Sequence, residues 1–156
     1  MNERKEALTL AIQNEIKAQN LYRMMAKAFS DEQTSLTFLN LVPLEEMHED
    51  KLLELYRAEF DDEPEIDRKA LPDFKVRKDL DDPKNILEFA IEQELIAYAA
   101  YKRLAILGDK EEDKALYNEL AAEELNHKAM LEERIEQLEG LLRWFDPSEL
   151  NGLMED

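Results

Sequence analysis

The chain has 156 residues, a net charge of −18 and no cysteine. Such an acidic chain is not expected to bind nucleic acid or an anionic membrane. The absence of cysteine excludes disulfides, thiolate zinc sites and iron–sulfur clusters within these residues. No apolar run is long enough to span a membrane and no apolar signal core lies near the start, so we expect a cytoplasmic protein with a single domain over residues 1–156.

The first part of the chain, residues 3–58, predicts two helices. The first of them covers residues 3–29. Ser30 and Gln33 then form a capping box, which predicts the start of the second helix. Residues 59–82 show little periodicity and contain acidic clusters next to prolines. We therefore expect these residues to connect the first pair of helices to the next element.

The second part, residues 83–140, predicts another pair of helices. Asp82 followed by Pro83 is typical of a helix start, because a proline at the first helical position loses no hydrogen bond. Gly108 indicates the end of this helix. Asp109 is then expected to cap the last long helix of the pair.

The length of the connecting segment predicts the topology. A helix of about 26 residues is roughly 39 Å long, and antiparallel neighbours need only a short turn between them. About 24 connecting residues are enough to run the whole length of a bundle. We therefore predict an all-α, ferritin-like four-helix bundle of two helical hairpins joined by a long crossover, with a short C-terminal helix over residues 141–156. The alternative is a loose insertion in an up-and-down bundle.

The two predicted hairpins repeat one another. Thirteen residues between Leu8 and Glu54 recur, without a gap, 79 positions later. The recurring positions step mostly by three and four, so they trace one face of each helix. This face carries four glutamates and two histidines: Glu15, Glu45, His48, Glu94, Glu124 and His127.

These six side chains predict a metal site. Four carboxylates facing one core are untenable alone, because burying even one unpaired charge costs several kcal/mol. Two divalent cations would neutralise them. A Glu-x-x-His pair on each of two helices, with a single glutamate on each of the other two, is the ligand pattern of di-iron and di-manganese bundles. The alternative is a buried polar network without metal.

The chain also resembles the rubrerythrin-like branch of the ferritin-like superfamily, across roughly residues 5–140. The resemblance rests on four motifs: Glu15-x-x-Ala18-x-x-x-Tyr22, Glu45-x-x-His48, Leu87-Glu88-Phe89-Ala90-Ile91-x-x-Glu94-x-x-Ala97-x-x-x-Tyr101 and Glu124-x-x-His127. It implies two iron ions per chain, or manganese or a mixed pair. Glu45 and Glu124 would bridge the metals, and the terminal ligands would be Glu15 with His48 and Glu94 with His127.

Two features depart from the family pattern. Rubrerythrins proper add a rubredoxin module with four cysteines, and this chain has none. They also carry a further glutamate three residues after the ligand of the third helix, where this chain has Ala97. The remaining set of six ligands is symmetrical, like that of bacterioferritin.

Some neighbouring residues have more than one interpretation. Tyr22 and Tyr101 each follow a candidate ligand by seven positions, and we expect their phenols to donate to a bridging carboxylate and to belong to the catalytic site with Glu45 and Glu124. The alternative is an ordinary core tyrosine. Four further acids step off the shared face and are expected to be solvated: Glu46, Glu49, Glu92 and Glu123.

The resemblance implies a di-iron oxidoreductase that reduces hydrogen peroxide, or dioxygen, in defence against oxidative stress. Its electrons would come from an external carrier protein. The alternative is a ferroxidase that handles or stores iron, but residues 141–156, broken by Pro147, are too short for the long fifth helix of a storage cage. A homodimer is also expected, with apolar residues of the outer helix faces forming the contact: Met25, Phe29, Leu53, Tyr56 and residues 141–145.

Overall fold

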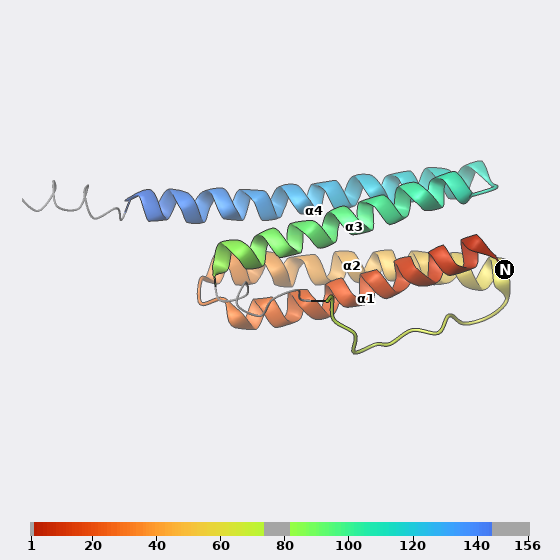
Figure 1. The fold of residues 1–156 in the computed structure, drawn as a ribbon, viewed down its shortest axis with the longest axis horizontal. Coiled ribbons are helices and arrows are strands. Elements are labelled where there is room, and N and C mark those ends of the chain that lie inside the picture. The colour runs from red at the N-terminus through yellow and green to blue at the C-terminus, as the bar shows by residue number, and fades with distance from the viewer. Residues whose placement is uncertain (1, 74–81, 145–156) are drawn as a thin grey trace, which may run out of the picture.

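The computed structural model describes residues 2–73 and 82–144, and their side chains as far as residue 140. These residues form four helices: α1 (Glu3–Ala28), α2 (Glu32–Phe60), α3 (Pro83–Leu107) and α4 (Glu111–Trp144). Figure 1 shows the four helices lying side by side as one elongated bundle. The prediction of an all-α four-helix bundle is therefore confirmed.

The bundle consists of two hairpins, α1–α2 and α3–α4, joined by a crossover. From the end of α2 the chain returns along α1 (Figure 1). Gln13 of α1 donates from Nε2 to the carbonyl of Asp67 at 2.8 Å and accepts the Asp67 N–H at 2.7 Å. Further along, Asn20 donates to the carbonyls of Arg68 and Ala70, both at 2.9 Å. These bonds place the described part of the crossover against α1.

The helix starts are explained by capping side chains. Asp82 accepts the N–H of Lys84 at 2.9 Å, as expected, with Pro83 as the first helical residue. The predicted cap at Ser30 is wrong, because Asp31 caps α2 instead and accepts the N–H of Thr34 at 3.0 Å. A carboxylate next to the helix start satisfies this N–H directly.

Two other boundaries differ from the prediction. Asp109 was expected to cap α4, but this helix starts two residues later at Glu111, and the carboxylate of Asp109 pairs with Arg4 of α1 instead. The helix α4 then continues through Gly140 to Trp144 without a break. A glycine inside a helix costs only about 1 kcal/mol, so it does not end α4. The rest of the predicted C-terminal helix lies outside the described residues.

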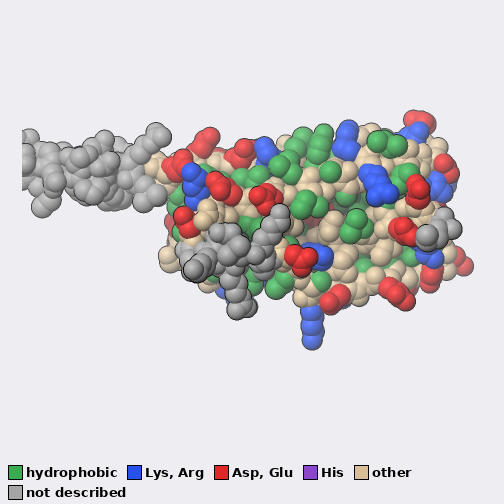
Figure 2. Space-filling view, viewed as in Figure 1, with side chains coloured by type: hydrophobic (Ala, Val, Ile, Leu, Met, Phe, Trp, Pro, Cys, Tyr) green, Lys and Arg blue, Asp and Glu red, His purple; other side chains and the backbone are tan. Residues whose placement is uncertain are grey.

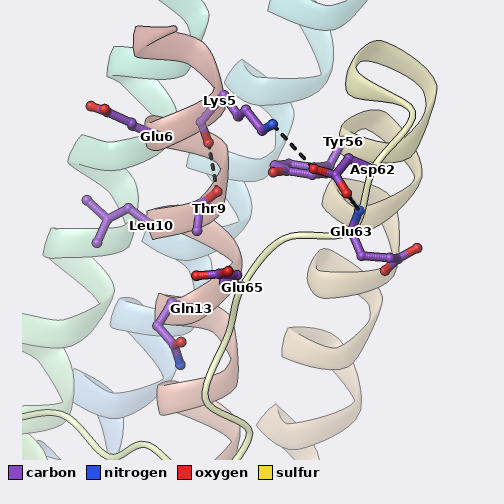
Figure 3. A pocket seen from close by; sticks show the side chains of 9 residues that line it. All are labelled: Lys5, Glu6, Thr9, Leu10, Gln13, Tyr56, Asp62, Glu63 and Glu65. Atoms are coloured by element: carbon purple, nitrogen blue, oxygen red, sulfur yellow. Dashed lines mark hydrogen bonds and ion pairs between the residues drawn. The ribbon is translucent and has the colours of Figure 1, made fainter. Parts of the chain in front are cut away.

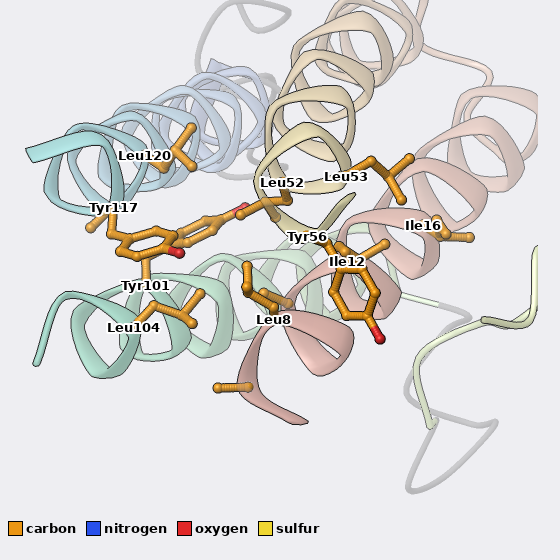
Figure 4. Close-up of a cluster of buried hydrophobic side chains, with 13 residues drawn as sticks. Leu8, Ile12, Ile16, Leu52, Leu53, Tyr56, Tyr101, Leu104, Tyr117 and Leu120 are labelled. Atoms are coloured by element: carbon orange, nitrogen blue, oxygen red, sulfur yellow. The ribbon is translucent and has the colours of Figure 1, made fainter. Parts of the chain in front are cut away.

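Two apolar clusters form the core, and in α2, α3 and α4 the candidate ligands lie between them along the helix. One cluster, drawn in Figure 4, includes Leu8, Leu52 and Tyr101. The other includes Leu41 and Leu87. In α2, for example, one cluster contains Phe38, Leu41 and Val42, and the other contains Leu52, Leu53 and Tyr56.

The prediction of which residues form a dimer contact is partly wrong. Met25, Leu53 and Tyr56 are buried in the two apolar clusters, and Phe29 packs against one of them. They therefore stabilise the chain itself. On the face seen in Figure 2, other apolar side chains reach the surface among scattered charged ones. None of the described helices is long and apolar enough to cross a membrane.

Candidate metal centre

The six predicted ligands lie together at the middle of the bundle. Each of the six residues is at most 4% exposed. The helices α1 and α3 each contribute one glutamate, and α2 and α4 each contribute a Glu-x-x-His pair: Glu15, Glu94, Glu45–His48 and Glu124–His127. Because the two members of a pair are three residues apart, they project from the same side of the helix.

The ligand atoms form two groups that share two carboxylates. In each group, one atom per residue lies within 4.8 Å of all the others. One group contains Glu15, Glu45, His48 and Glu124, and the other contains Glu45, Glu94, Glu124 and His127. The two shared members, Glu45 and Glu124, hold the position that a bridging carboxylate would need.

Both imidazoles direct Nδ1 toward the carboxylates of the opposite hairpin. Nδ1 of His48 lies 2.7 Å from Oε1 of Glu124, and Nδ1 of His127 lies 2.6 Å from Oε1 of Glu45. The two rings stack with their centroids 5.5 Å apart and an interplanar angle of 13°. Each hairpin thus supplies a nitrogen beside a shared carboxylate of the other.

Hydrogen bonds do not satisfy these atoms. Nine buried side-chain nitrogen and oxygen atoms in the described residues lack a hydrogen-bond partner, and seven of them belong to the six candidate ligands. Buried polar groups in proteins are nearly always paired. The set of carboxylate oxygens and imidazole nitrogens suits iron or manganese, and two divalent cations would offset four negative charges. The geometry therefore fits metal ions better than a polar network.

Tyr22 and Tyr101 each donate a hydrogen bond to a carboxylate that belongs to only one of the two ligand groups. The hydroxyl of Tyr22 donates to Oε1 of Glu94, and that of Tyr101 donates to Oε1 of Glu15. The expectation that they bind a bridging carboxylate is wrong. Residues seven apart in one helix are separated by roughly 10 Å along its axis, so each phenol meets the glutamate of the antiparallel neighbour instead.

Glu123 was expected to be solvated, and it is only half-buried, but its carboxylate has a partner at the centre. Its Oε2 lies 2.7 Å from Nε2 of His48, the outer nitrogen of the ring. A carboxylate at the outer nitrogen fixes the tautomer and strengthens the inner nitrogen as a ligand. The partners lie on different helices, so no spacing within α4 could have predicted the pair.

Glu49 was also expected to be solvated, yet it is only 6% exposed. Gln19 of α1 donates to its Oε1 at 2.9 Å, and Arg68 of the crossover donates to its Oε2 at 2.8 Å. The carboxylate therefore joins α1, α2 and the crossover. Glu46 and Glu92 are exposed, as expected.

The environment of the centre changes its proton affinity. Burial, followed by the charges of Glu15 and Glu94, raises the pKa of both Glu45 and Glu124 well above the ordinary value. Without metal, this centre therefore favours protonated shared carboxylates. Because metal ligands must be deprotonated, binding of cations would release protons.

Burial also raises the pKa of the two phenols, Tyr22 and Tyr101. It raises the pKa of Tyr22 well above the usual value, and the charge of Glu94 adds to the effect. The pKa of Tyr101 is raised by burial and by Glu15. Both hydroxyls therefore stay protonated at neutral pH and act as donors to the carboxylates.

A surface groove lies apart from the six ligands, beside the first half of α1 and the start of the crossover (Figure 3). Its volume is about 660 Å³. Lys5 crosses the groove, and its Nζ lies 3.4 Å from Oδ2 of Asp62. None of the candidate ligands lines it.

Comparisons with known proteins agree with this arrangement. A family of sequences described as rubrerythrin matches residues 6–84, whereas no curated protein matches the chain. A hypothetical protein from Pyrococcus furiosus has a similar structure, with a TM-score of 0.75 and 27% identity over 91% of this chain and 92% of that chain. A conserved hypothetical protein from Mycobacterium tuberculosis, 12% identical, has a TM-score of 0.72 over 85% of this chain and 89% of that one. The second similarity concerns the fold alone.

Proposed function

Because the chain belongs to the rubrerythrin family, we propose that it is a di-iron redox protein that reduces hydrogen peroxide, or dioxygen. The observation that carries this proposal is the group of seven unpaired buried atoms on four glutamates and two histidines. Two such ions, when bound, supply the two electrons that cleavage of an O–O bond requires.

The residues of the centre have separate tasks in this proposal. Glu45 and Glu124 would bridge the two metal positions. Glu15 with His48 would hold one position, and the equivalent residues of the second hairpin would hold the other. The burial of all six ligands excludes bulk water and keeps the charges in an environment of low dielectric constant, where their interaction with a cation is strong.

Tyr22 and Tyr101 orient the terminal carboxylates. Each phenol donates its proton in a hydrogen bond to Glu94 or Glu15. The raised pKa values keep these protons in place at neutral pH. Each terminal glutamate therefore has one oxygen bound by a phenol, and its second oxygen is buried without a hydrogen-bond partner.

The electrons must come from outside the 156 residues, because these contain no cysteine and so no thiolate-bound iron. Reduction of one peroxide molecule to two water molecules consumes two electrons and two protons. We therefore propose a separate carrier protein as the electron donor.

One observation favours a second function, that of a ferroxidase which oxidises Fe²⁺ for handling or storage. Ala97, three residues after Glu94, packs against one apolar cluster and supplies no carboxylate. The six ligands therefore form a symmetrical set, and a symmetrical set is the feature that resembles bacterioferritin.

Rapid mixing distinguishes the two functions. The protein is loaded with iron, reduced without oxygen, and mixed with peroxide or with dioxygen in separate experiments. Peroxide reduction predicts oxidation by peroxide much faster than by dioxygen, with the iron retained. Slow reaction with peroxide, together with a large assembly that accumulates hundreds of iron ions, would contradict the proposal and support storage.

A further inference from the structure

The 79-residue repeat makes the candidate centre nearly symmetrical. Glu15 and His48 of the first hairpin correspond to Glu94 and His127 of the second. Two metal positions with equivalent ligands would bind their ions with equal affinity if their surroundings were the same. The groups at the outer nitrogen of each imidazole matter most, because they set its tautomer and its strength as a ligand.

The symmetry breaks at these outer nitrogens. Nε2 of His48 lies 2.7 Å from Oε2 of Glu123. The residue 79 positions before Glu123 is Leu44, which cannot accept a hydrogen bond. The side-chain contacts of His127 with carboxylates all involve Nδ1, and no side chain in the described residues binds its Nε2.

The carboxylate of Glu123 has two effects on His48. It holds the proton on Nε2, so the lone pair of Nδ1 points toward Glu15 and Glu124. It also makes the imidazole a stronger donor to a cation. We propose that the two metal positions are inequivalent, and that the position of Glu15 and His48 binds its ion more tightly and fills first.

Glu123 is therefore a positioning residue that acts through His48. The inference rests on the proposed function, since it requires that the centre binds two ions. It adds an order of filling, which the symmetrical ligand set alone would not predict.

Titration with Co²⁺ tests the order of filling, because this ion binds nitrogen and oxygen ligands and its absorption reports their geometry. In the unchanged protein we expect two equivalents whose affinities differ by about 10- to 100-fold. Glu123→Leu, which copies Leu44, should weaken the tight equivalent by a similar factor, so that the two affinities become alike. In Glu123→Gln the affinity of the tight equivalent should lie between its values in the unchanged protein and in Glu123→Leu, because an amide oxygen still accepts the hydrogen bond.

Matched variants assign the tight equivalent to its position. Glu15→Gln and Glu94→Gln change corresponding ligands of the two hairpins, and we expect only Glu15→Gln to remove the tight equivalent. Glu119→Leu removes an exposed carboxylate one turn before Glu123 and should leave both affinities unchanged. The melting temperature of each metal-free variant separates loss of affinity from loss of folding.

Three outcomes would overturn the inference. These are equal affinities in the unchanged protein, equal weakening of both equivalents by Glu123→Leu, or loss of the tight equivalent in Glu94→Gln alone. A protein that binds no Co²⁺ at the centre would instead contradict the proposed function. The two failures are therefore distinguishable in a single titration.

Discussion

At the residue scale, Glu45 and Glu124 are the two carboxylates that belong to both ligand groups. We predict that the protein binds about two iron ions per chain and that Glu45→Ala combined with Glu124→Ala abolishes this binding, because each metal position loses both shared ligands. Metal analysis after iron loading and gel filtration measures the effect. The matched control is Glu46→Ala with Glu119→Ala, two exposed acids on the same helices. Stoichiometric binding by the first double variant would contradict the ligand assignment.

We predict that removing either phenol hydroxyl lowers the free energy of unfolding by the same amount. Tyr22→Phe and Tyr101→Phe each remove one hydrogen bond to a buried carboxylate. Because hydrogen bonds to charged groups contribute about 1.5–3 kcal/mol, each variant should lose about that much free energy of unfolding in denaturant titrations. Tyr117→Phe is the control, since Tyr117 is also buried and no described residue forms such a bond with its hydroxyl; its loss should stay below about 0.5 kcal/mol. Unequal losses for the two phenols would show that the halves of the centre differ in more than Glu123.

The raised pKa values of Glu45 and Glu124 predict how stability depends on pH. In the metal-free protein the folded state binds more protons at these groups than the unfolded state does, so stability falls as pH rises from the ordinary glutamate range through their folded pKa values. Denaturant titrations across this range should give a decreasing free energy of unfolding. Glu45→Gln with Glu124→Gln should flatten the curve, because the amides cannot ionise. An unchanged slope in this double variant would contradict the electrostatic account.

At the element scale, capping explains where the helices begin. Asp31 accepts the N–H of Thr34, whereas Ser30 lies outside the helix. Asp31→Ala should therefore destabilise the protein by about 1 kcal/mol, and Ser30→Ala should change stability by much less. Thermal or denaturant unfolding of the two variants compares them directly. A larger loss for Ser30→Ala would mean that the cap is misassigned.

The repeat made the helices and the six buried candidate ligands predictable, because both depend on spacing within a helix. Glu45 and His48, for example, share one face at any helix packing angle. The contacts of Glu123 and Glu49 were not predictable from such spacing. Their partners come from another helix and from the crossover, and only the packed bundle brings them together.

At the scale of the whole molecule, a homodimer stays a prediction. The residues first expected at its contact are mostly buried, but other apolar side chains are exposed, including Leu39 and Met47 of α2 and Ile96 of α3. Exposed apolar residues often mark a contact with a partner. Light scattering at micromolar concentration should give about twice the chain mass of 18.3 kDa. A mass near that of a single chain would contradict the dimer.

The side chains that hold the crossover have a consequence for the ancestry of the chain. Gln13 and Asn20 bind the crossover, yet the residues 79 positions later are Glu92 and Ala99. In the described residues only the first copy of the hairpin has a crossover to hold, whereas both copies keep three candidate ligands. Two copies of a single hairpin, related by a two-fold axis, would present the same six ligands without any crossover. The chain therefore has the form expected from the fusion of a symmetrical two-chain ancestor, with its first half later adapted to hold the connection.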